Sequence, residues 1–147
     1  MFDLVLNKNE EKKLEALGVE ALILFGSQAQ GLATERSDID IGVLVEYPIL
    51  RDRQQRKNVY DALYDMISGK HDRLTDIDIV FLQDAPMELR AHVMKYGVPL
   101  YECNPRSFPR FKEYVMDSYA DFAPNREEFQ RGILSRILWP LALLKKM

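Results

Sequence analysis

Hydrophobic and polar positions follow two different periods along the chain, and their order predicts a mixed α/β fold. Short apolar runs predict strands at 19–25, 38–45, 76–82 and, as a short edge strand, 98–102. Apolar residues spaced three or four positions apart predict helices over about 49–67 and from Pro86 to Tyr96. Strands and helices therefore alternate, which is typical of a sheet with helices packed on it.

Both ends of the chain are predicted to be helical. Asn7 and Glu10 have the spacing of a capping box, which predicts a short helix directly after Asn7. Toward the C-terminus, apolar residues again recur every three or four positions, at Phe108, Phe111, Val115, Tyr119 and Phe122. A last helix is expected from about Arg126 until Pro140 interrupts it.

This pattern predicts a single domain over residues 1–147, with a core at about 18–102 and a helical tail at about 106–147. The aromatic stripe of the tail is interpreted as packing on the sheet or on another helix, with docking of a partner as the alternative. A chain of 147 residues is long enough to bury roughly 70% of its unfolded surface.

The composition excludes several classes of protein. Seven Gly, seven Pro and one Cys exclude a collagen-like repeat and a disulfide scaffold, and 47% hydrophobic residues exclude a disordered chain. A formal charge of −3 argues against stable binding of nucleic acid through a broad basic surface. No apolar run approaches the roughly 20 residues that cross a bilayer, and the start is not a signal peptide. We expect a cytoplasmic protein.

Two carboxylates with alternate spacing are the first candidates for chemistry. Asp38 and Asp40 share one face of a predicted strand, about 6.5–7 Å apart between Cα atoms. Side chains at this spacing can reach one divalent cation or a pair, and oxygen ligands favour Mg²⁺ or Mn²⁺ over zinc. A third carboxylate on another strand would complete such a site, and both Asp76 and Asp78 are available for metal binding or proton transfer.

A second candidate is the dipeptide Gly26-Ser27, which directly follows the first buried strand. A glycine here lets the backbone approach a ligand closely, and the serine hydroxyl and nearby N–H groups can bind phosphate oxygens. Ten residues separate Ser27 from Asp38, so the phosphate donors and the carboxylates could face one cavity.

The two motifs together resemble a known signature. Gly26-Ser27-Gln28-Ala29-Gln30-Gly31 followed by Ser37-Asp38-Ile39-Asp40-Ile41 resembles that of the DNA-polymerase-β-like nucleotidyltransferases. Within this superfamily the chain is most similar to the minimal nucleotidyltransferase (MNT) domains, antitoxins paired with HEPN toxins. The similarity covers about residues 18–102 and implies an α+β fold, a small mixed sheet flanked by helices.

The resemblance also implies a role for each matching residue. Asp38, Asp40 and Asp78 would be the catalytic, metal-binding carboxylates for two Mg²⁺ ions, and Gly26 and Ser27 would hold the phosphates of ATP. The implied reaction is Mg-dependent transfer of AMP to a tyrosine hydroxyl of the cognate HEPN toxin, which blocks its RNase activity.

The chain departs from the signature at Gln30, where many family members have Arg; Arg36 could substitute. Two other functions stay open: an antibiotic-type nucleotidyltransferase for small molecules, and a non-catalytic antitoxin that binds its toxin. A basic cluster is interpreted as a solvated helix face, with phosphate or partner contact as the alternative: Arg51, Arg53, Arg56 and Lys57. Three further residues are interpreted as ordinary surface or core positions: His71, His92 and Cys103.

Overall fold

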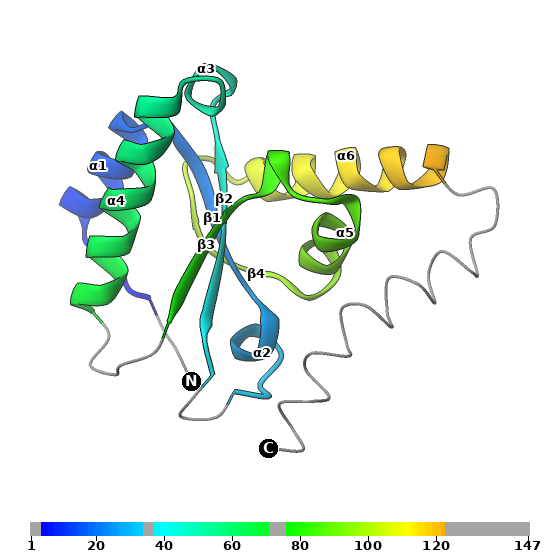
Figure 1. Ribbon diagram of the computed structural model, residues 1–147, viewed down its shortest axis with the longest axis horizontal. Helices are drawn as coiled ribbons and strands as arrows, with labels where there is room; N and C mark the ends of the chain where they lie inside the picture. The colour runs from blue at the N-terminus through cyan, green and yellow to red at the C-terminus, as the bar shows by residue number, and fades with distance from the viewer. Residues whose placement is uncertain (1–3, 34–36, 71–75, 123–147) are drawn as a thin grey trace.

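A computed structural model describes residues 4–33, 37–70 and 76–122 (Figure 1). Its elements follow one another as α1 (Lys8–Ala16), β1 (Val19–Phe25), α2 (Gly26–Ala29), β2 (Ile39–Val45), α3 (Tyr47–Leu50), α4 (Arg53–Gly69), β3 (Ile77–Phe81), η1 (Leu82–Asp84), α5 (Met87–Tyr96), β4 (Val98–Glu102) and α6 (Ser107–Phe122). Over these ranges no helix combines the length and the apolar character needed to cross a bilayer. The helix expected from about Arg126 lies outside the described residues.

The four strands form one mixed sheet in the order β3-β2-β1-β4. β1 runs antiparallel to both β2 and β4, whereas β2 and β3 are parallel. This architecture confirms the predicted α/β class and its small mixed sheet with flanking helices. The predicted edge strand is β4, which pairs with β1.

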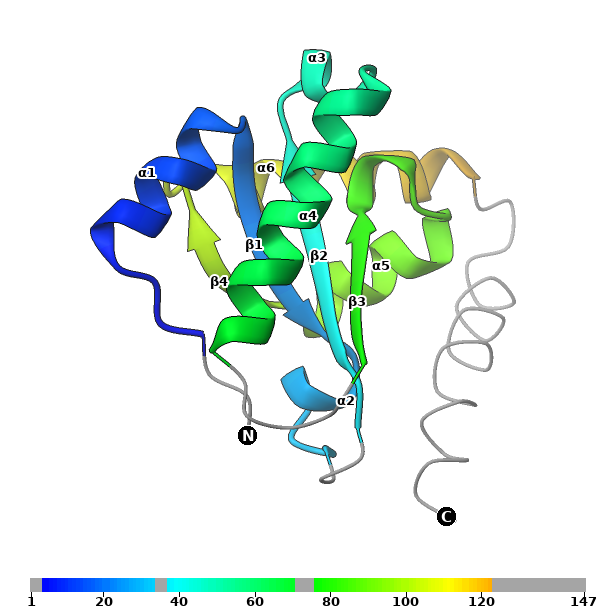
Figure 2. The same cartoon turned by 60° about the vertical axis from the view of Figure 1, so that its left-hand side comes forward.

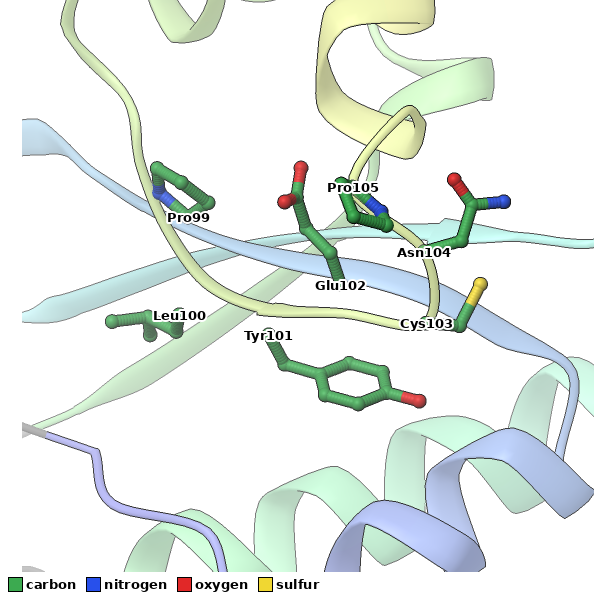
Figure 3. A pocket seen from close by; sticks show the side chains of 7 residues that line it. All are labelled: Pro99, Leu100, Tyr101, Glu102, Cys103, Asn104 and Pro105. Atoms are coloured by element: carbon green, nitrogen blue, oxygen red, sulfur yellow. The ribbon is translucent and has the colours of Figure 1, made fainter.

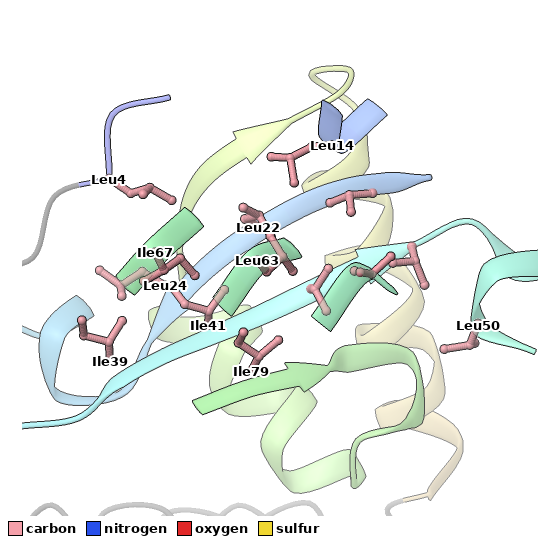
Figure 4. Close-up of a cluster of buried hydrophobic side chains, with 14 residues drawn as sticks. Leu4, Leu14, Leu22, Leu24, Ile39, Ile41, Leu50, Leu63, Ile67 and Ile79 are labelled. Atoms are coloured by element: carbon pink, nitrogen blue, oxygen red, sulfur yellow. The ribbon is translucent and has the colours of Figure 1, made fainter. Parts of the chain in front are cut away.

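Helices cover both faces of the sheet, so the domain has two hydrophobic cores. Figures 1 and 2 show α1 and α4 on one face and α5 and α6 on the other. The core beneath α4 contains side chains from three strands, and Figure 4 shows its members, among them Leu22, Ile41, Leu63 and Ile79. The core beneath α5 and α6 includes Ile23, Leu44, Leu82 and Val93.

The N-terminal capping box is present as predicted. The Asn7 side chain accepts a hydrogen bond from the Glu10 N–H at 2.8 Å, and the Glu10 carboxylate accepts one from the Asn7 N–H at 3.0 Å. Glu10 also pairs with Lys70, which follows α4, at 2.8 Å. The cap therefore fixes the start of α1 and links it to the end of α4.

The prediction of a single helix over about 49–67 is wrong in one respect, because the segment forms two helices, α3 and α4. Pro48 lies within the first turn of α3, where its fixed φ angle is tolerated. Asp52 then caps α4, since its side chain accepts a hydrogen bond from the Gln55 N–H at 3.0 Å. The cap starts a new helix after α3 rather than continuing the old one.

The first helix of the tail packs on the sheet. Phe108, Phe111 and Val115 of α6 belong to the second core, together with residues of β1 and α5. The Glu102 side chain accepts a hydrogen bond from the Phe108 N–H at 3.0 Å, which fixes the start of α6 against β4. For these three side chains the packing interpretation is confirmed.

Gly42 in the middle of β2 lets Leu82 lie directly on the sheet, and this contact generates a test. A Cβ at Gly42 would lie 2.7 Å from Leu82 Cδ1. We expect Gly42→Ala to lower the free energy of unfolding by about 1–3 kcal/mol through overpacking, measured by urea denaturation. Gly69→Ala is the matched control, because a Cβ there meets nothing within 4 Å. Equal stability of the two variants would contradict this account.

Candidate functional site

The sheet places the predicted carboxylates at one end of neighbouring strands. Asp38 directly precedes β2, and Asp40 is the second residue of that strand. In the parallel pair β2–β3, Asp40 lies opposite Asp78, and in the antiparallel pair β1–β2 it lies opposite Phe25. The C-terminal end of β1 and the N-terminal ends of β2 and β3 therefore lie at the same end of the sheet.

Strand alternation turns all three carboxylates to the same face of the sheet. Ile39, Ile41 and Ile79 point into the core beneath α4. Asp38, Asp40 and Asp78 therefore point to the opposite face, which α5 and α6 cover further along the strands. Asp38 and Asp78 are exposed and Asp40 is half-buried. The three predicted carboxylates therefore share one face of the sheet, at the end where β2 and β3 begin.

Gly26 brings the backbone into contact with this face. Its φ angle is +72°, in the left-handed region that favours glycine. A Cβ built on Gly26 would overlap the Asp40 carboxylate oxygen Oδ2. A glycine is therefore required here by both the backbone conformation and the close approach of Asp40.

Gly26 and Ser27 also begin the short helix α2, seen beside the ends of the strands in Figure 2. The first N–H groups of an α-helix have no partner within the helix, and the preceding Phe25 provides no side-chain cap. Ser27 is buried against the sheet. The arrangement thus brings backbone donors suited to phosphate next to the Asp40 carboxylate.

The carboxylates raise one another's affinity for protons. Burial, together with the neighbouring Asp78 and Asp38 charges, raises the pKa of Asp40 to about 6. Burial and the charges of Asp76 and Asp78 also raise the pKa of Asp38. Both shifts report carboxylates that are partly removed from water beside like charges, a situation that a cation would relieve.

The donor chemistry fits a hard divalent cation, because Asp38, Asp40 and Asp78 offer carboxylate oxygens, which Mg²⁺ prefers. In the part of the chain that the structure describes, no three His, Cys, Asp or Glu side chains converge as a ready ligand group. The three aspartates are nevertheless close enough to perturb one another electrostatically and share a face. To bind one cation together, the three aspartate side chains would have to rotate toward one another.

The basic cluster lies at the other end of the sheet and does not contribute to the site. Arg56 pairs with Asp84, which follows β3, at 2.6 Å and lies over the Phe81 ring at 4.6 Å. Lys57 pairs with Asp61 along α4 at 2.7 Å. Arg56 thus joins α4 to η1, and a phosphate or partner contact of the basic cluster stays a prediction.

Other sequence candidates also lie away from the carboxylates. His92 is buried, its ring lies at a tilt to the Tyr96 ring with 5.1 Å between the centroids, and its burial lowers its pKa, as expected of a packed histidine. Cys103 is exposed at the edge of the sheet. It lines a pocket of about 290 Å³ formed by residues 99–105 (Figure 3). Arg36 and His71 lie outside the described residues.

Sequence reasoning missed the state of Gln30. Its side-chain oxygen Oε1 is buried without a hydrogen-bond partner in the described structure. The departure from the family signature at Gln30 drew attention to this residue. The sequence alone, however, does not show whether one side-chain oxygen is buried.

The raised pKa of Asp40 predicts a pH-dependent stability. The stabilising protonated form is fully present below the unfolded-state pKa of about 3.9 and is lost as pH rises through about 6. We expect the free energy of unfolding in EDTA to fall by about 1–3 kcal/mol from pH 4 to pH 7 relative to Asp40→Asn. Urea titrations check this, with exposed Asp65→Asn as control. Parallel curves for wild type and Asp40→Asn would contradict it.

Comparison with solved structures finds the same fold in toxin–antitoxin proteins. A chain of a crystal structure of a toxin–antitoxin with AMP-PNP matches with 25% identity and a TM-score of 0.59, covering 88% of this chain and 99% of that one. A mutant of the toxin–antitoxin MntA-HpeT matches with 25% identity, a TM-score of 0.57 and the same coverage. A chain of a structure of a tri-AMPylated Shewanella oneidensis HEPN toxin in complex with MNT antitoxin also matches, with 21% identity and a TM-score of 0.52. The match covers 86% of this chain and 98% of that one.

No curated protein matches the sequence. The family model "Polymerase beta, Nucleotidyltransferase" matches residues 7–106, which include α2, every strand and all three predicted carboxylates. This match covers more than half of the chain and confirms the resemblance found in the sequence. The protein belongs to the polymerase beta nucleotidyltransferase family.

Proposed function

We propose that this nucleotidyltransferase is an antitoxin that transfers AMP from ATP to a tyrosine hydroxyl of a HEPN toxin. The observation that carries the proposal is the contact of Gly26 with Asp40 on the face shared by Asp38 and Asp78. It joins a phosphate-binding turn to a carboxylate cluster in one place. The similarity to toxin–antitoxin structures, one of them with AMP-PNP, supports the antitoxin role and the nucleotide.

Asp38, Asp40 and Asp78 would hold Mg²⁺. The bound cation supplies positive charge that neutralises the nucleotide phosphates and the developing charge of the reaction. The raised pKa of Asp40 supports this role, because burial and the charges of Asp78 and Asp38 both disfavour the ionised carboxylate, which a bound cation would stabilise. The N–H groups at the start of α2 and the Ser27 hydroxyl would donate hydrogen bonds to the phosphate oxygens.

In the proposed reaction the acceptor hydroxyl oxygen attacks the α-phosphorus of ATP. The bond from the α-phosphorus to the bridging oxygen breaks, and pyrophosphate leaves in line. Asp78 is exposed at the face of the cluster, so it can accept the proton of the attacking hydroxyl. Its position opposite Asp40 holds this proton acceptor next to the phosphate site.

The acceptor is proposed to come from another chain. Asp38 and Asp78 are exposed where β2 and β3 begin, and the pocket in Figure 3 lies along β4, which is separated from β2 by β1. A protruding tyrosine of a partner protein can reach exposed carboxylates. The antibiotic-type alternative gains no support from the placement of that pocket.

We expect Asp38→Asn and Asp40→Asn each to reduce AMP transfer by about 100-fold or more, because each removes a charge that the cation requires. The measurement is label from α-³²P-ATP on a candidate HEPN partner with Mg²⁺, with EDTA as a second means of abolishing transfer. Asp65→Asn, on the exposed side of α4, is the control. Wild-type protein that neutralises the toxin without labelling it would instead support the non-catalytic antitoxin.

We expect Gly26→Ala to abolish AMP transfer while Gly31→Ala retains it. Both glycines have positive φ angles, +72° and +70°, so both substitutions bear a similar backbone strain. A Cβ at Gly26 overlaps Asp40, whereas one at Gly31 meets nothing within 4 Å. Transfer rates and thermal melting of the two variants separate the clash from the strain. Equal loss of transfer in both variants would show that the Asp40 contact is unimportant.

A further inference from the structure

Tyr47 is an exposed tyrosine that belongs to neither hydrophobic core. It is 65% exposed, more than any other tyrosine in the part of the chain that the structure describes. It begins α3, the short helix that forms a tip of the domain in Figures 1 and 2. A tyrosine hydroxyl is the acceptor group of the proposed reaction, so Tyr47 has the chemistry to receive AMP.

An arginine lies on the Tyr47 hydroxyl. Arg51 Nε donates a hydrogen bond to this oxygen at 3.0 Å, and the guanidinium carbon lies 5.1 Å from the centre of the Tyr47 ring. The two contacts hold the tyrosine in one exposed orientation, which lowers the entropy lost when it binds. A guanidinium at this oxygen also stabilises the negative charge that develops as the hydroxyl loses its proton.

The tip around this tyrosine carries positive charge that the fold leaves unpaired. Arg51 and Arg53 are both exposed, and neither forms an ion pair within the described residues. Two acids in the same stretch are directed to the protein itself. The Asp52 side chain caps α4, and the Glu46 carboxylate lies beside Gly18. The tip is therefore suited to an acidic surface.

Tyr47 and the carboxylate face lie at opposite ends of β2. Asp40 is the second residue of this strand, and Tyr47 follows its last residue, Val45, by two positions. The strand spans about 16 Å between Asp40 and Val45 at ~3.3 Å per residue, so Tyr47 cannot reach the phosphate site of its own chain. Asp38 and Asp78 are exposed, and a second copy can approach them.

We propose that Tyr47 is a further AMP acceptor, modified at the carboxylate face of another copy of this chain. The arginines of the tip complement the aspartates of that face. The Tyr47 hydroxyl oxygen forms a bond to the α-phosphorus of ATP, and the bond from this phosphorus to the bridging oxygen breaks. Pyrophosphate leaves, and Asp78 of the other copy accepts the proton. The inference rests on the proposed function, since it uses the same transfer site.

Other exposed tyrosines have acidic surroundings instead. Tyr114 of α6 is 58% exposed, but Glu113 precedes it and Asp117 lies one helical turn further along. Tyr60 and Tyr64 stack on each other with 6.3 Å between ring centroids, and an aspartate directly follows each of them on α4. Like charges oppose the approach of these tyrosines to the carboxylate face. Charge therefore favours the tip over α4 and α6.

The test divides enzyme and acceptor between two full-length variants. Tyr47→Phe keeps the carboxylate face and loses the acceptor, whereas Asp40→Asn keeps the acceptor and loses transfer. With α-³²P-ATP and Mg²⁺, we expect neither variant alone to be labelled. Their mixture should label the Asp40→Asn chain, which a size tag distinguishes. Wild type alone should carry AMP on Tyr47 by peptide mass spectrometry, and Tyr114→Phe, the matched control, should be labelled as wild type is.

A charge variant tests the fit of the two surfaces. We expect Arg51→Gln/Arg53→Gln to label itself about tenfold more slowly than wild type, because opposite charges no longer steer the encounter. Labelling of wild type should slow in the same way at high salt. An unchanged rate in the double variant contradicts the proposed charge complementarity.

The inference is overturned if the Asp40→Asn chain stays unlabelled in the mixture, or if Tyr47→Phe labels itself as wild type does. A candidate HEPN partner in the same assay separates this failure from that of the proposed function. Tyr47→Phe that labels the partner but not the Asp40→Asn chain is folded and active, so only the inference fails. Wild type that labels neither itself nor the partner overturns the proposed function as well.

Discussion

The close approach of the Gly26 backbone to the Asp40 carboxylate is the constraint on which the site depends. It requires a glycine with a φ angle of +72° at the end of β1 and a carboxylate directly opposite on β2. The same contact partly desolvates Asp40 beside two other aspartates, which keeps its pKa at about 6. A stable fold without a ligand would not need this concentration of charge. The unfavourable charge therefore supports the proposal that this face holds a cation and a nucleotide.

The two cores explain how the sheet can support such a face. Each strand that bears an aspartate fills the core beneath α4 with its other side chains, Ile39, Ile41 and Ile79. The second core, beneath α5 and α6, includes Phe25, which lies opposite Asp40, and continues along the strands with Leu44 and Leu82. The carboxylates thus stand on a packed layer, and on their own side Asp38 and Asp78 are exposed.

Much of the fold was predictable from sequence, because strand and helix periods and the Asn7 cap are local properties. The strand bounds of β1 and the capping box are confirmed, whereas the division of residues 49–67 depended on the competing preferences of Pro48 and Asp52. The alternation of Asp38 and Asp40 predicted their shared face. The pairing of Asp40 with Asp78, the overlap of a Gly26 Cβ with Asp40 and the unpaired Gln30 oxygen arise from register and packing, which residue order does not specify.

The mixed direction of the sheet also bears on how the site assembles during folding. Phe25 and Asp40 pair across an antiparallel connection of 40 − 25 = 15 residues, whereas Asp40 and Asp78 pair in parallel across 78 − 40 = 38 residues. Closing the longer loop costs about 0.8 kcal/mol more in chain entropy. The turn proposed to bind phosphate and the first two carboxylates thus belong to one local unit of the chain. The residue proposed to take the proton joins them through a long-range contact, so it depends most on the integrity of the whole domain.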